Sequence, residues 1–439
     1  MDLHTINTLE FDKIINILSD FAVTYLGKNK CLKLLPINNI DTITLWQNET
    51  NEALRLIQKK GNIPICEIDN IIISLKKLES YGVLSAKEIL SIGKILKLSR
   101  NLKHYFFEEH DDVDISFALD IENYFSSLYT NIDIEKSIFD TILDEYAIAD
   151  RATTELYNIR RKQKDLENRI RDRLNQIITS SKYSKFLQDN VVTIKNERFV
   201  IPVKQECRSE IPGLVHDISS SGATVFIEPT SVFDMNNSIK ELKILEEHEI
   251  EKILKNLSDK INTITDNLFA NLDLIGYIDF IFAKAKYALN LRANIPNLNT
   301  DGIIILTKAR NPLIEQNKVV PIDISIGTDF SSLVITGPNT GGKTVTLKTI
   351  GLLTLMACSG LHIPADEKSI LCVFDNVFAD IGDEQSIQES LSTFSSHMVN
   401  IVKILKYVSC NSLVILDELR FWNRSDRRKC PCNINSRTF

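Results

Sequence analysis

The sequence predicts a multidomain α/β protein built from a helical core, a long two-helix arm and a separate α/β domain. Apolar residues recur at helical spacing through residues 1–125, and two heptad repeats flank a stretch near 190–230 where the period changes to two. Further along, a glycine-rich loop lies between an apolar run and a helical segment. At 439 residues the chain is too long for one ordinary core, so we expect about two to four domains.

Residues 1–130 are predicted to form a helical core or lever. Leu9, Phe11 and Ile14 are spaced as on one helix face, and similar spacing returns between Ile89 and Leu98. The segment Gly61–Pro64 interrupts the pattern and marks a turn. No arrangement of side chains in this region indicates chemistry, so we interpret it as structural.

Residues 131–275 are predicted to form an antiparallel coiled-coil arm. We expect one long helix over residues 134–187 and another after residue 230, because both segments carry apolar residues at three- and four-residue steps. The first seam contains Ala152, Leu156, Ile159, Leu166, Ile170, Leu174 and Ile177, and the second contains Ile250, Leu254, Leu257, Ile261, Ile264 and Leu268. Each helix alone would be only marginally stable in water, so the seams are expected to bury each other.

Between residues 190 and 230 the arm is predicted to carry a small β clamp tip. The runs 191–194 and 199–203 have strand character and flank Asn196 and Glu197, which predicts a hairpin. Basic side chains on this tip are candidates for contact with nucleic-acid phosphates, although single basic residues on strands more often serve solubility. The candidates are Lys195, Arg198, Lys204 and Arg208.

The first arm helix is also basic on its surface. From Arg151 to Lys185 there are ten Lys or Arg and four Asp or Glu. Such a run is consistent with a solvated face that carries ion pairs. It is equally consistent with a stalk that lies beside a polyanion.

Residues 276–419 are predicted to form the α/β domain around a phosphate-binding loop of the form G-x-x-x-x-G-K-T. The apolar run Leu333–Thr336 is predicted as the buried strand before the loop, and a helix is predicted after it. Backbone N–H groups of such a loop and the helix N-terminus suit phosphate oxygens, which predicts ATP as a ligand. The candidate nucleotide-binding residues are Gly337, Pro338, Asn339, Thr340, Gly341, Gly342, Lys343 and Thr344.

Four residues in or near this loop are assigned roles in phosphate binding, metal binding and catalysis. Lys343 can reach the β- and γ-phosphates, and the Thr344 hydroxyl can bind Mg²⁺. The apolar strand Ser412–Leu416 ends in Asp417 and Glu418. Asp417 suits the outer shell of the Mg²⁺ ion, and Glu418 suits a general base that orients water towards the γ-phosphate.

Composition limits the classes of function. The formal charge of −7 argues against a globally basic nucleic-acid binder, so any such contact needs a local patch. The sequence shows no signal peptide or membrane-spanning run. Its eight cysteines are scattered without zinc-site spacing, which predicts reduced thiols in a cytoplasmic protein.

The glycine-rich loop and the segments around it resemble the ATPase of MutS-type proteins. Among these proteins the chain resembles the second bacterial type, a recombination-suppressing paralogue that bears an Smr endonuclease domain. The resemblance implies an ABC-type P-loop ATPase with a mostly parallel sheet, here incomplete, and coiled-coil clamps that grip branched DNA. It covers residues 1–419 and is carried by Thr8–Ile14, Phe199–Val203, Ser221–Thr224, Thr336–Ala365, Phe378–Ser386 and Leu391–Met398.

The same resemblance implies further roles and partners. Ser392 matches the serine that reaches across a homodimer to the partner's γ-phosphate, so Ser392 joins the nucleotide-binding candidates. The segment Arg310–Pro312 matches an Ala-Arg-His-Pro element near the nucleotide base, but Asn311 replaces the histidine, so no base contact is carried over. Members of the family are also implicated in acting on stalled ribosomes.

After Glu418 the sequence departs from the family pattern, which continues Asp-Glu-Leu-Gly-x-Gly-Thr-Asp-Pro. Dropping one base from permitted codons for Arg420 onward restores Gly-Ser-Gly-Thr-Asp-Pro, and the fixed codon of Trp422 then yields a glycine. We therefore interpret residues 420–439 as an out-of-frame tail, of biological or sequencing origin. On this interpretation the ATPase is truncated after the strand that ends in Asp417 and Glu418, the endonuclease domain is missing and the homodimer is weakened.

Three functions are open on this evidence. The first is ATP-dependent binding of branched or recombination-intermediate DNA, with suppression of recombination. The second is an ATPase that grips ribosomal RNA on stalled ribosomes, and the third is an inactive fragment. Binding of branched DNA compared with purified ribosomes separates the first two, and ATP turnover compared with a frame-restored chain tests the third.

Overall fold

The computed structural model describes residues 2–108, 117–337, 341–382 and 390–417, with the backbone alone described for 390–397. It confirms a mixed α/β protein with several sheets. The chain divides into two compact units. The first unit contains Met1–Ile68, Leu98–Tyr129 and Ala270–Phe439, and the second contains Asp69–Lys97 and Thr130–Phe269.

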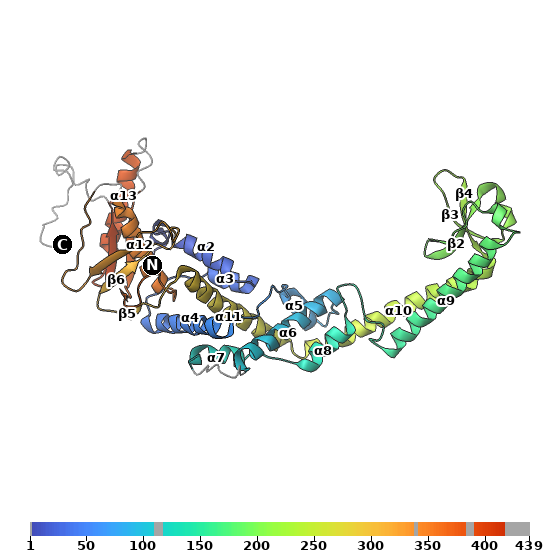
Figure 1. The fold of residues 1–439 in the computed structure, drawn as a ribbon, viewed down its shortest axis with the longest axis horizontal. Helices are drawn as coiled ribbons and strands as arrows, with labels where there is room; N and C mark the ends of the chain where they lie inside the picture. The colour runs from blue at the N-terminus through green and yellow to red at the C-terminus, as the bar shows by residue number, and fades with distance from the viewer. Residues whose placement is uncertain (1, 109–116, 338–340, 383–389, 418–439) are drawn as a thin grey trace. The chain divides into compact units, whose positions relative to one another are not determined.

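The first unit combines the N-terminal helices with the segment after residue 270 (Figure 1). Its helices are α1 (Leu3–Thr8), α2 (Phe11–Phe21), α3 (Tyr25–Leu32), α4 (Ile40–Lys60), α7 (Leu119–Ser126), α12 (Lys343–Ala357) and α13 (Ser390–Tyr407), with parts of α6 (Ala86–Phe107) and α11 (Thr265–Leu291). Its strands are β5 (Asn297–Asn299), β6 (Ile304–Ala309), β7 (Ile322–Ile326), β8 (Ile370–Cys372), β9 (Asn376–Asp380) and β10 (Ser412–Leu416). The predicted helical character of the N-terminal region is confirmed.

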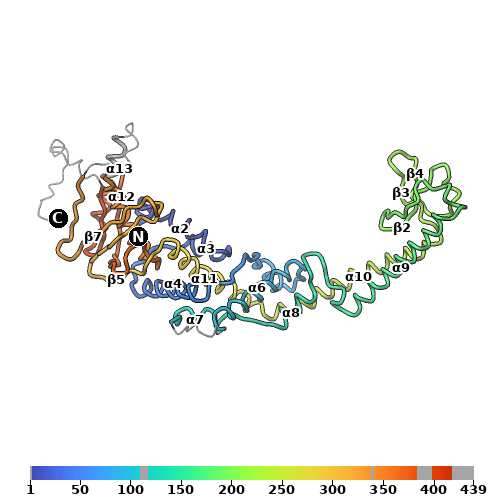
Figure 2. Tube along the Cα trace, viewed as in Figure 1, coloured from blue at the N-terminus to red at the C-terminus, as the bar shows by residue number. Residues whose placement is uncertain are grey.

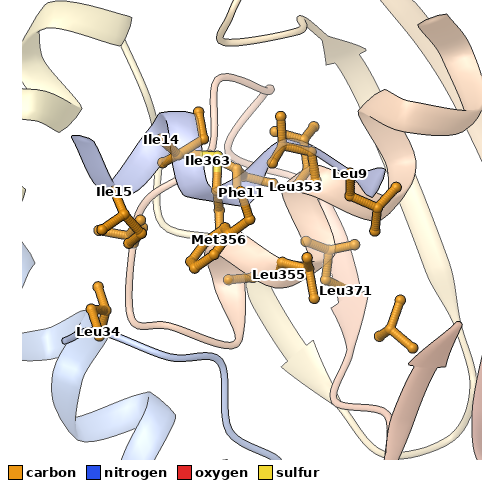
Figure 3. Close-up of a cluster of buried hydrophobic side chains, with 14 of the residues drawn as sticks. Leu9, Phe11, Ile14, Ile15, Leu34, Leu353, Leu355, Met356, Ile363 and Leu371 are labelled. Carbon is orange, nitrogen blue, oxygen red and sulfur yellow. The ribbon is translucent and has the colours of Figure 1, made fainter. Parts of the chain in front are cut away.

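A buried apolar cluster packs α2 against α12 (Figure 3). Leu9 and Phe11 meet Leu353 and Met356 in this cluster, and all four side chains are fully buried. A Cβ atom on Gly351 would lie 2.7 Å from Leu9 Cδ1, so the missing side chain permits this close approach. The cluster therefore holds the helix that carries the phosphate-loop lysine.

The described strands of the first unit form one mixed four-stranded sheet and one parallel pair, whereas the family resemblance implied a mostly parallel sheet. One sheet has the order β5-β8-β6-β7, in which β5 and β8 are parallel and β6 is antiparallel to both of its neighbours. The strands β9 and β10 form a separate parallel pair. The difference arises because β6 and β7 follow each other along the chain and pair as antiparallel neighbours, as closely connected strands commonly do.

The prediction of a buried strand at Leu333–Thr336 is wrong in this structure. The segment has no regular secondary structure, and the side chains of Leu333 and Val334 are exposed. An apolar run becomes a strand only when neighbouring strands satisfy its backbone groups. Among the described residues this run pairs with no strand, since β9 and β10 pair only with each other.

The second unit is a helical body that ends in a small sheet (Figure 1). Its helices are α5 (Ile72–Glu79), α8 (Ile132–Thr141), α9 (Thr154–Thr179) and α10 (Thr230–Asn262), with two short 3-10 helices, η1 (Ser184–Phe186) and η2 (Gln205–Glu210). Its strands are β1 (Thr193–Lys195), β2 (Arg198–Lys204), β3 (Gly213–Ile218) and β4 (Thr224–Pro229). The trace enters this sheet from α9 and leaves it through α10, in the predicted order (Figure 2). The heptad register of α9 and α10 stays a prediction.

The single helix predicted over residues 134–187 is wrong, because α8 and α9 are separate helices. Between them the chain forms a tight turn, in which Leu143 N donates to Ala147 O at 2.9 Å and Ala149 N donates to Thr141 O at 2.8 Å. The second helix then begins at a side-chain cap, where Thr153 Oγ1 accepts a hydrogen bond from Leu156 N at 3.1 Å. The turn contains neither glycine nor proline, so the usual sequence signals of a break are absent.

The hairpin predicted across Asn196 and Glu197 is confirmed. These two residues have φ angles of 47° and 61°, as a two-residue turn between antiparallel strands requires, and β1 pairs with β2 on either side. The sheet order is β1-β2-β4-β3, yet Lys195 of β1 contacts Asp217 of β3, so the two outer strands meet at one end. One face of the sheet packs on α9 and α10 through Phe199, Ile201, Val203, Val225 and Ile227.

No helix within the described ranges is long and apolar enough to cross a membrane. The six cysteines in the described part of the chain carry free thiols, and no cluster of His, Cys, Asp and Glu there could hold a metal ion.

Candidate functional site

The two glycines at the described ends of the predicted phosphate-binding loop have a backbone conformation that favours glycine. Gly337 and Gly342 have φ angles of 149° and 76°, which side-chain-bearing residues rarely adopt. Apart from the chain neighbours, no heavy atom of the described residues lies within 4 Å of a Cβ built on either glycine. Gly342 is the residue before α12, where the free backbone N–H groups of a helix begin. The predicted residues Pro338, Asn339 and Thr340 lie outside the described residues.

Thr344 and Asp417 come together although 73 residues separate them. Thr344 Oγ1 donates to Asp417 Oδ2 at 2.5 Å. The backbone fixes this aspartate, because Asp417 N donates to Asp380 O at 3.0 Å at the end of the β9–β10 pair. Hydroxyl and carboxylate oxygens are ligands that Mg²⁺ prefers, so this pair fits the predicted metal role.

Lys343 is half-buried at the first position of α12, and its ammonium group turns back over the loop. Lys343 Nζ donates to Gly337 O at 2.7 Å. This contact holds the charge above the glycine backbone, beside the positive end of the helix dipole. The site thus concentrates donors and positive charge where an anionic phosphate would lie.

Two predicted residues of this site cannot be placed. Glu418 lies outside the described residues. Ser392 lies within α13, but its side chain is likewise outside the description.

The segment that resembles an Ala-Arg-His-Pro element contacts the backbone and α12. Arg310 Nη2 donates to Leu291 O and Arg292 O, both at 3.0 Å. Asn311 Nδ2 donates to Thr349 Oγ1 at 3.1 Å, which ties this segment to the helix that follows the phosphate loop. Both side chains therefore have structural contacts that sequence reasoning did not predict.

The far end of α12 is joined to α4 by contacts that sequence reasoning also missed. Gln47 Nε2 donates to Ala357 O at 3.4 Å, and Thr50 Oγ1 donates to Gly360 O at 3.2 Å. Gly360 has a φ of 69°, and a Cβ there would lie 2.4 Å from Trp46 Cβ. The phosphate-loop helix is thus fixed at both ends, by the loop and by α4. No local sequence signal could indicate partners 310 residues apart.

His362 follows this junction, and we predict that it makes stability depend on pH. The ring is buried, with Nε2 3.4 Å from Gln47 O, and burial lowers its pKa from 6.5 to about 4. Between these two values the unfolded chain binds a proton that the folded chain does not, so stability should fall as pH falls through this window and stay level above it.

The expected loss from His362 between neutral pH and pH 5 is about 2 kcal/mol. The measurement is urea unfolding of the wild type and His362→Gln near pH 7 and near pH 5. Since carboxylates titrate in both proteins, only the difference between them reports the histidine. An equal loss in both proteins would contradict the assignment.

The structure separates the four candidate residues of the tip. Lys195 Nζ lies 2.9 Å from Asp217 Oδ2, and Arg198 Nη1 lies 2.8 Å from Glu228 Oε1. Lys204 Nζ donates instead to a backbone oxygen, Lys185 O, at 3.3 Å. Arg208 lies in η2 with an exposed side chain. Lys195 and Arg198 therefore form ion pairs with carboxylates, and within the described residues Lys204 and Arg208 have no ion pair with a carboxylate.

Glu228 is the centre of a buried polar network in the tip. Its side chain is fully buried, and it accepts hydrogen bonds from Arg198 Nη1 at 2.8 and 3.0 Å and from Asn236 Nδ2 at 2.7 Å. His216 Nε2 lies 2.5 Å from Glu228 Oε2. Arg198 Nη2 also donates to Asn237 Oδ1 at 2.6 Å, so the network ties β2 and β4 to the start of α10. This is a structural arrangement that sequence reasoning did not predict.

Comparison with known proteins gives two findings. The family described as MutS domain V matches residues 333–421, the region of the phosphate loop and the Asp417 strand. The chain is 48% identical over 419 residues to "Endonuclease MutS2" of Acetivibrio thermocellus, 47% identical to that of Bacillus velezensis and 44% identical to that of Clostridioides difficile. Each alignment covers 95% of this chain and 53% of the relative. The chain thus spans about half the length of the curated relatives that it matches.

Proposed function

We infer that this chain is a MutS2-family protein, since both the domain V match and the MutS2 relatives support that family. From this premise we propose that it binds and hydrolyses ATP with Mg²⁺ through the first unit and binds branched DNA through the second. We also propose that its biological role is the suppression of recombination. Homodimerisation through the first unit and a cytoplasmic location belong to the same proposal.

One observation carries the nucleotide half of this proposal. The hydrogen bond between Thr344 and Asp417 brings the hydroxyl of the phosphate-loop helix to the carboxylate at the end of β10. Two motifs that the sequence could only place in the same domain are therefore neighbours in space. ATP binding by such a site would need Lys343 at the phosphates, Thr344 and Asp417 at the Mg²⁺ ion and backbone N–H groups around the loop.

Replacing Asp417 with Ala should weaken ATP binding mainly when Mg²⁺ is present. We expect a loss of roughly ten- to a hundred-fold in that case, the range typical of losing a supporting ligand of a metal. Titration of the full chain with ATP in Mg²⁺ and in a chelator is the measurement, and Asp301→Ala, an exposed acidic residue of the same unit, is the control. Equal losses with and without the metal would show that Asp417 acts on the fold instead.

Glu418→Ala should leave ATP affinity unchanged and lower turnover, because only the group that orients water is removed. Turnover of the full chain tests this assignment only if the wild type hydrolyses ATP. The same comparison is made with a frame-restored chain, in which the family continuation replaces residues 420–439. By resemblance, that chain would also place the partner's Ser392 at the site.

Nucleic-acid binding is tested with two ligands. The full chain should bind a four-way DNA junction at low salt, with an affinity that falls steeply as salt rises. Purified ribosomes are the second ligand, because rRNA presents the same phosphates. If the chain binds ribosomes more tightly than the junction, the partner is rRNA and not DNA. If it binds neither, the proposed nucleic-acid function is rejected.

A further inference from the structure

The strand β9 ends in a buried carboxylate that is not a member of the Thr344–Asp417 pair. Asp380 is the last residue of this strand, and only 6% of its surface is exposed. It lies opposite Leu416 in the parallel β9–β10 pair, and Asp417 follows directly, so the two carboxylate residues lie at the same edge. Burying a carboxylate is costly unless hydrogen bonds replace the lost water, so the position of Asp380 depends on its partners.

Asn400 of α13 is one of these partners. Its Nδ2 donates to Asp380 Oδ1 at 2.9 Å, and the same nitrogen lies 3.4 Å from Ala379 O. A side-chain amide supplies the hydrogens that a carboxylate can only accept, so the two groups are chemically matched. The contact joins residues 20 positions apart on a helix and a strand. It therefore fixes α13 to the end of β9.

A chain of hydrogen bonds leads from Asn400 to the helix of the phosphate loop. Asp380, which Asn400 holds by its side chain, accepts at its backbone oxygen from Asp417 N at 3.0 Å. Asp417 Oδ2 in turn accepts from Thr344 Oγ1 at 2.5 Å. The position of the Asp417 carboxylate is thus coupled through the strand end to a side chain of α13.

The helix that carries Asn400 has a second link to the proposed ATP site. Ser392 belongs to the same helix, about two turns before Asn400. By resemblance, Ser392 serves the nucleotide of a partner subunit. Asn400 therefore lies where this helix meets the strand end that holds Asp417.

We propose that Asn400 is a positioning residue for the binding of ATP with Mg²⁺. By holding Asp380 it fixes the end of β9, and with it the Asp417 carboxylate opposite Thr344. This inference rests on the proposed ATP-binding function and deepens it with two residues to which sequence reasoning assigned no role. Asn400 acts through the strand end and not on the nucleotide itself. Its loss should weaken the part of ATP binding that depends on Mg²⁺ and spare the part that Lys343 and the loop provide.

The test is a double-mutant cycle on the full chain, made of the wild type, Asn400→Asp, Asp380→Asn and the two substitutions together. Asn400→Asp keeps the shape of the side chain but turns a second carboxylate towards Asp380, whereas the double variant restores one donor and one acceptor with their roles exchanged. ATP affinity is measured by equilibrium titration with Mg²⁺ and with a chelator.

Asn400→Asp should weaken ATP binding in Mg²⁺ about tenfold, the low end of the range for residues that support a metal ligand. Binding in the chelator should stay unchanged. The double variant should recover most of the loss, because the side-chain contact between the two positions is restored.

Two further variants separate positioning from loss of the fold. Lys403→Gln is the control on the same helix, because Lys403 forms its ion pair at the surface with Asp2. Such pairs contribute little, so this variant should bind ATP like the wild type. Asn400→Ala removes the donor without adding a charge and takes the place of Asn400→Asp if that variant does not fold. Urea unfolding followed by circular dichroism gives the stability of each protein.

The outcomes distinguish the positioning role from the proposed function. A loss that is confined to Mg²⁺ and recovered in the double variant supports the role of Asn400. Equal losses in Mg²⁺ and in the chelator overturn it, and so do losses of the two single variants that simply add in the double variant. Wild-type affinity in Asn400→Asp and Asn400→Ala, while the wild type itself binds ATP more tightly with Mg²⁺, overturns the role and leaves the proposed function standing. Absence of ATP binding by the wild type overturns both.

Discussion

Lys343→Ala is expected to abolish ATP binding. The ammonium group is held over the loop by Gly337 O at 2.7 Å, and it is the lysine that the motif assigns to the β- and γ-phosphates. A hydrogen bond to a charged group contributes about 1.5–3 kcal/mol, and loss of a cation that contacts two phosphates should therefore reduce affinity at least about a hundred-fold. The measurement is equilibrium titration of the full chain with ATP and Mg²⁺.

A matched control for Lys343 lies on the same helix. Lys348 is a lysine of α12 whose Nζ lies 3.6 Å from Glu10 Oε2, outside the phosphate loop. Lys348→Ala should bind ATP like the wild type. If Lys343→Ala also kept the wild-type affinity, the loop would not be the nucleotide site.

Glu228→Ala should destabilise the second unit by about 3–5 kcal/mol, the range measured when one partner of a buried ion pair is removed. The substitution would leave Arg198, Asn236 and His216 without the carboxylate that they share, and Glu228 has no exposed surface where water could replace it. Urea unfolding followed by circular dichroism measures the loss.

The control for Glu228 is Asp217→Ala, because Asp217 forms an exposed ion pair with Lys195 on the same sheet. Exposed pairs contribute little to stability, so this variant should unfold like the wild type. Equal and small effects of the two substitutions would show that the Glu228 network is not needed for folding of the tip. A large effect of Glu228→Ala alone is the predicted result.

The parts of the fold that sequence could predict are those with local causes. The helices of the N-terminal region follow from apolar spacing, and the hairpin at Asn196 and Glu197 follows from two turn residues between two strands. The helix after the phosphate loop follows from the motif itself. In each case the residues that determine the element lie within one or two turns of chain.

The parts that sequence could not predict depend on distant partners. From the sequence alone Arg198 appears as an unpaired basic residue. In the folded chain it forms an ion pair with Glu228 of a neighbouring part of the sheet. The apolar run Leu333–Thr336 has strand character, but strand formation also requires a neighbouring strand, which no local pattern reveals. Likewise the contact of Gln47 with the end of α12 joins residues 310 positions apart. Register, burial and ion pairing of this kind are set by tertiary packing.

ATP-dependent binding of branched DNA, the first of the three functions expected from the sequence, is tested most directly by one linkage measurement. The affinity of the full chain for a labelled four-way junction is determined with ATP and Mg²⁺, with Mg²⁺ alone, and for Lys343→Ala under both conditions. We predict that ATP changes the affinity of the wild type by about 5- to 150-fold, the usual range of coupling between two sites, and leaves that of Lys343→Ala unchanged. Equal affinity of the wild type with and without ATP would contradict the account.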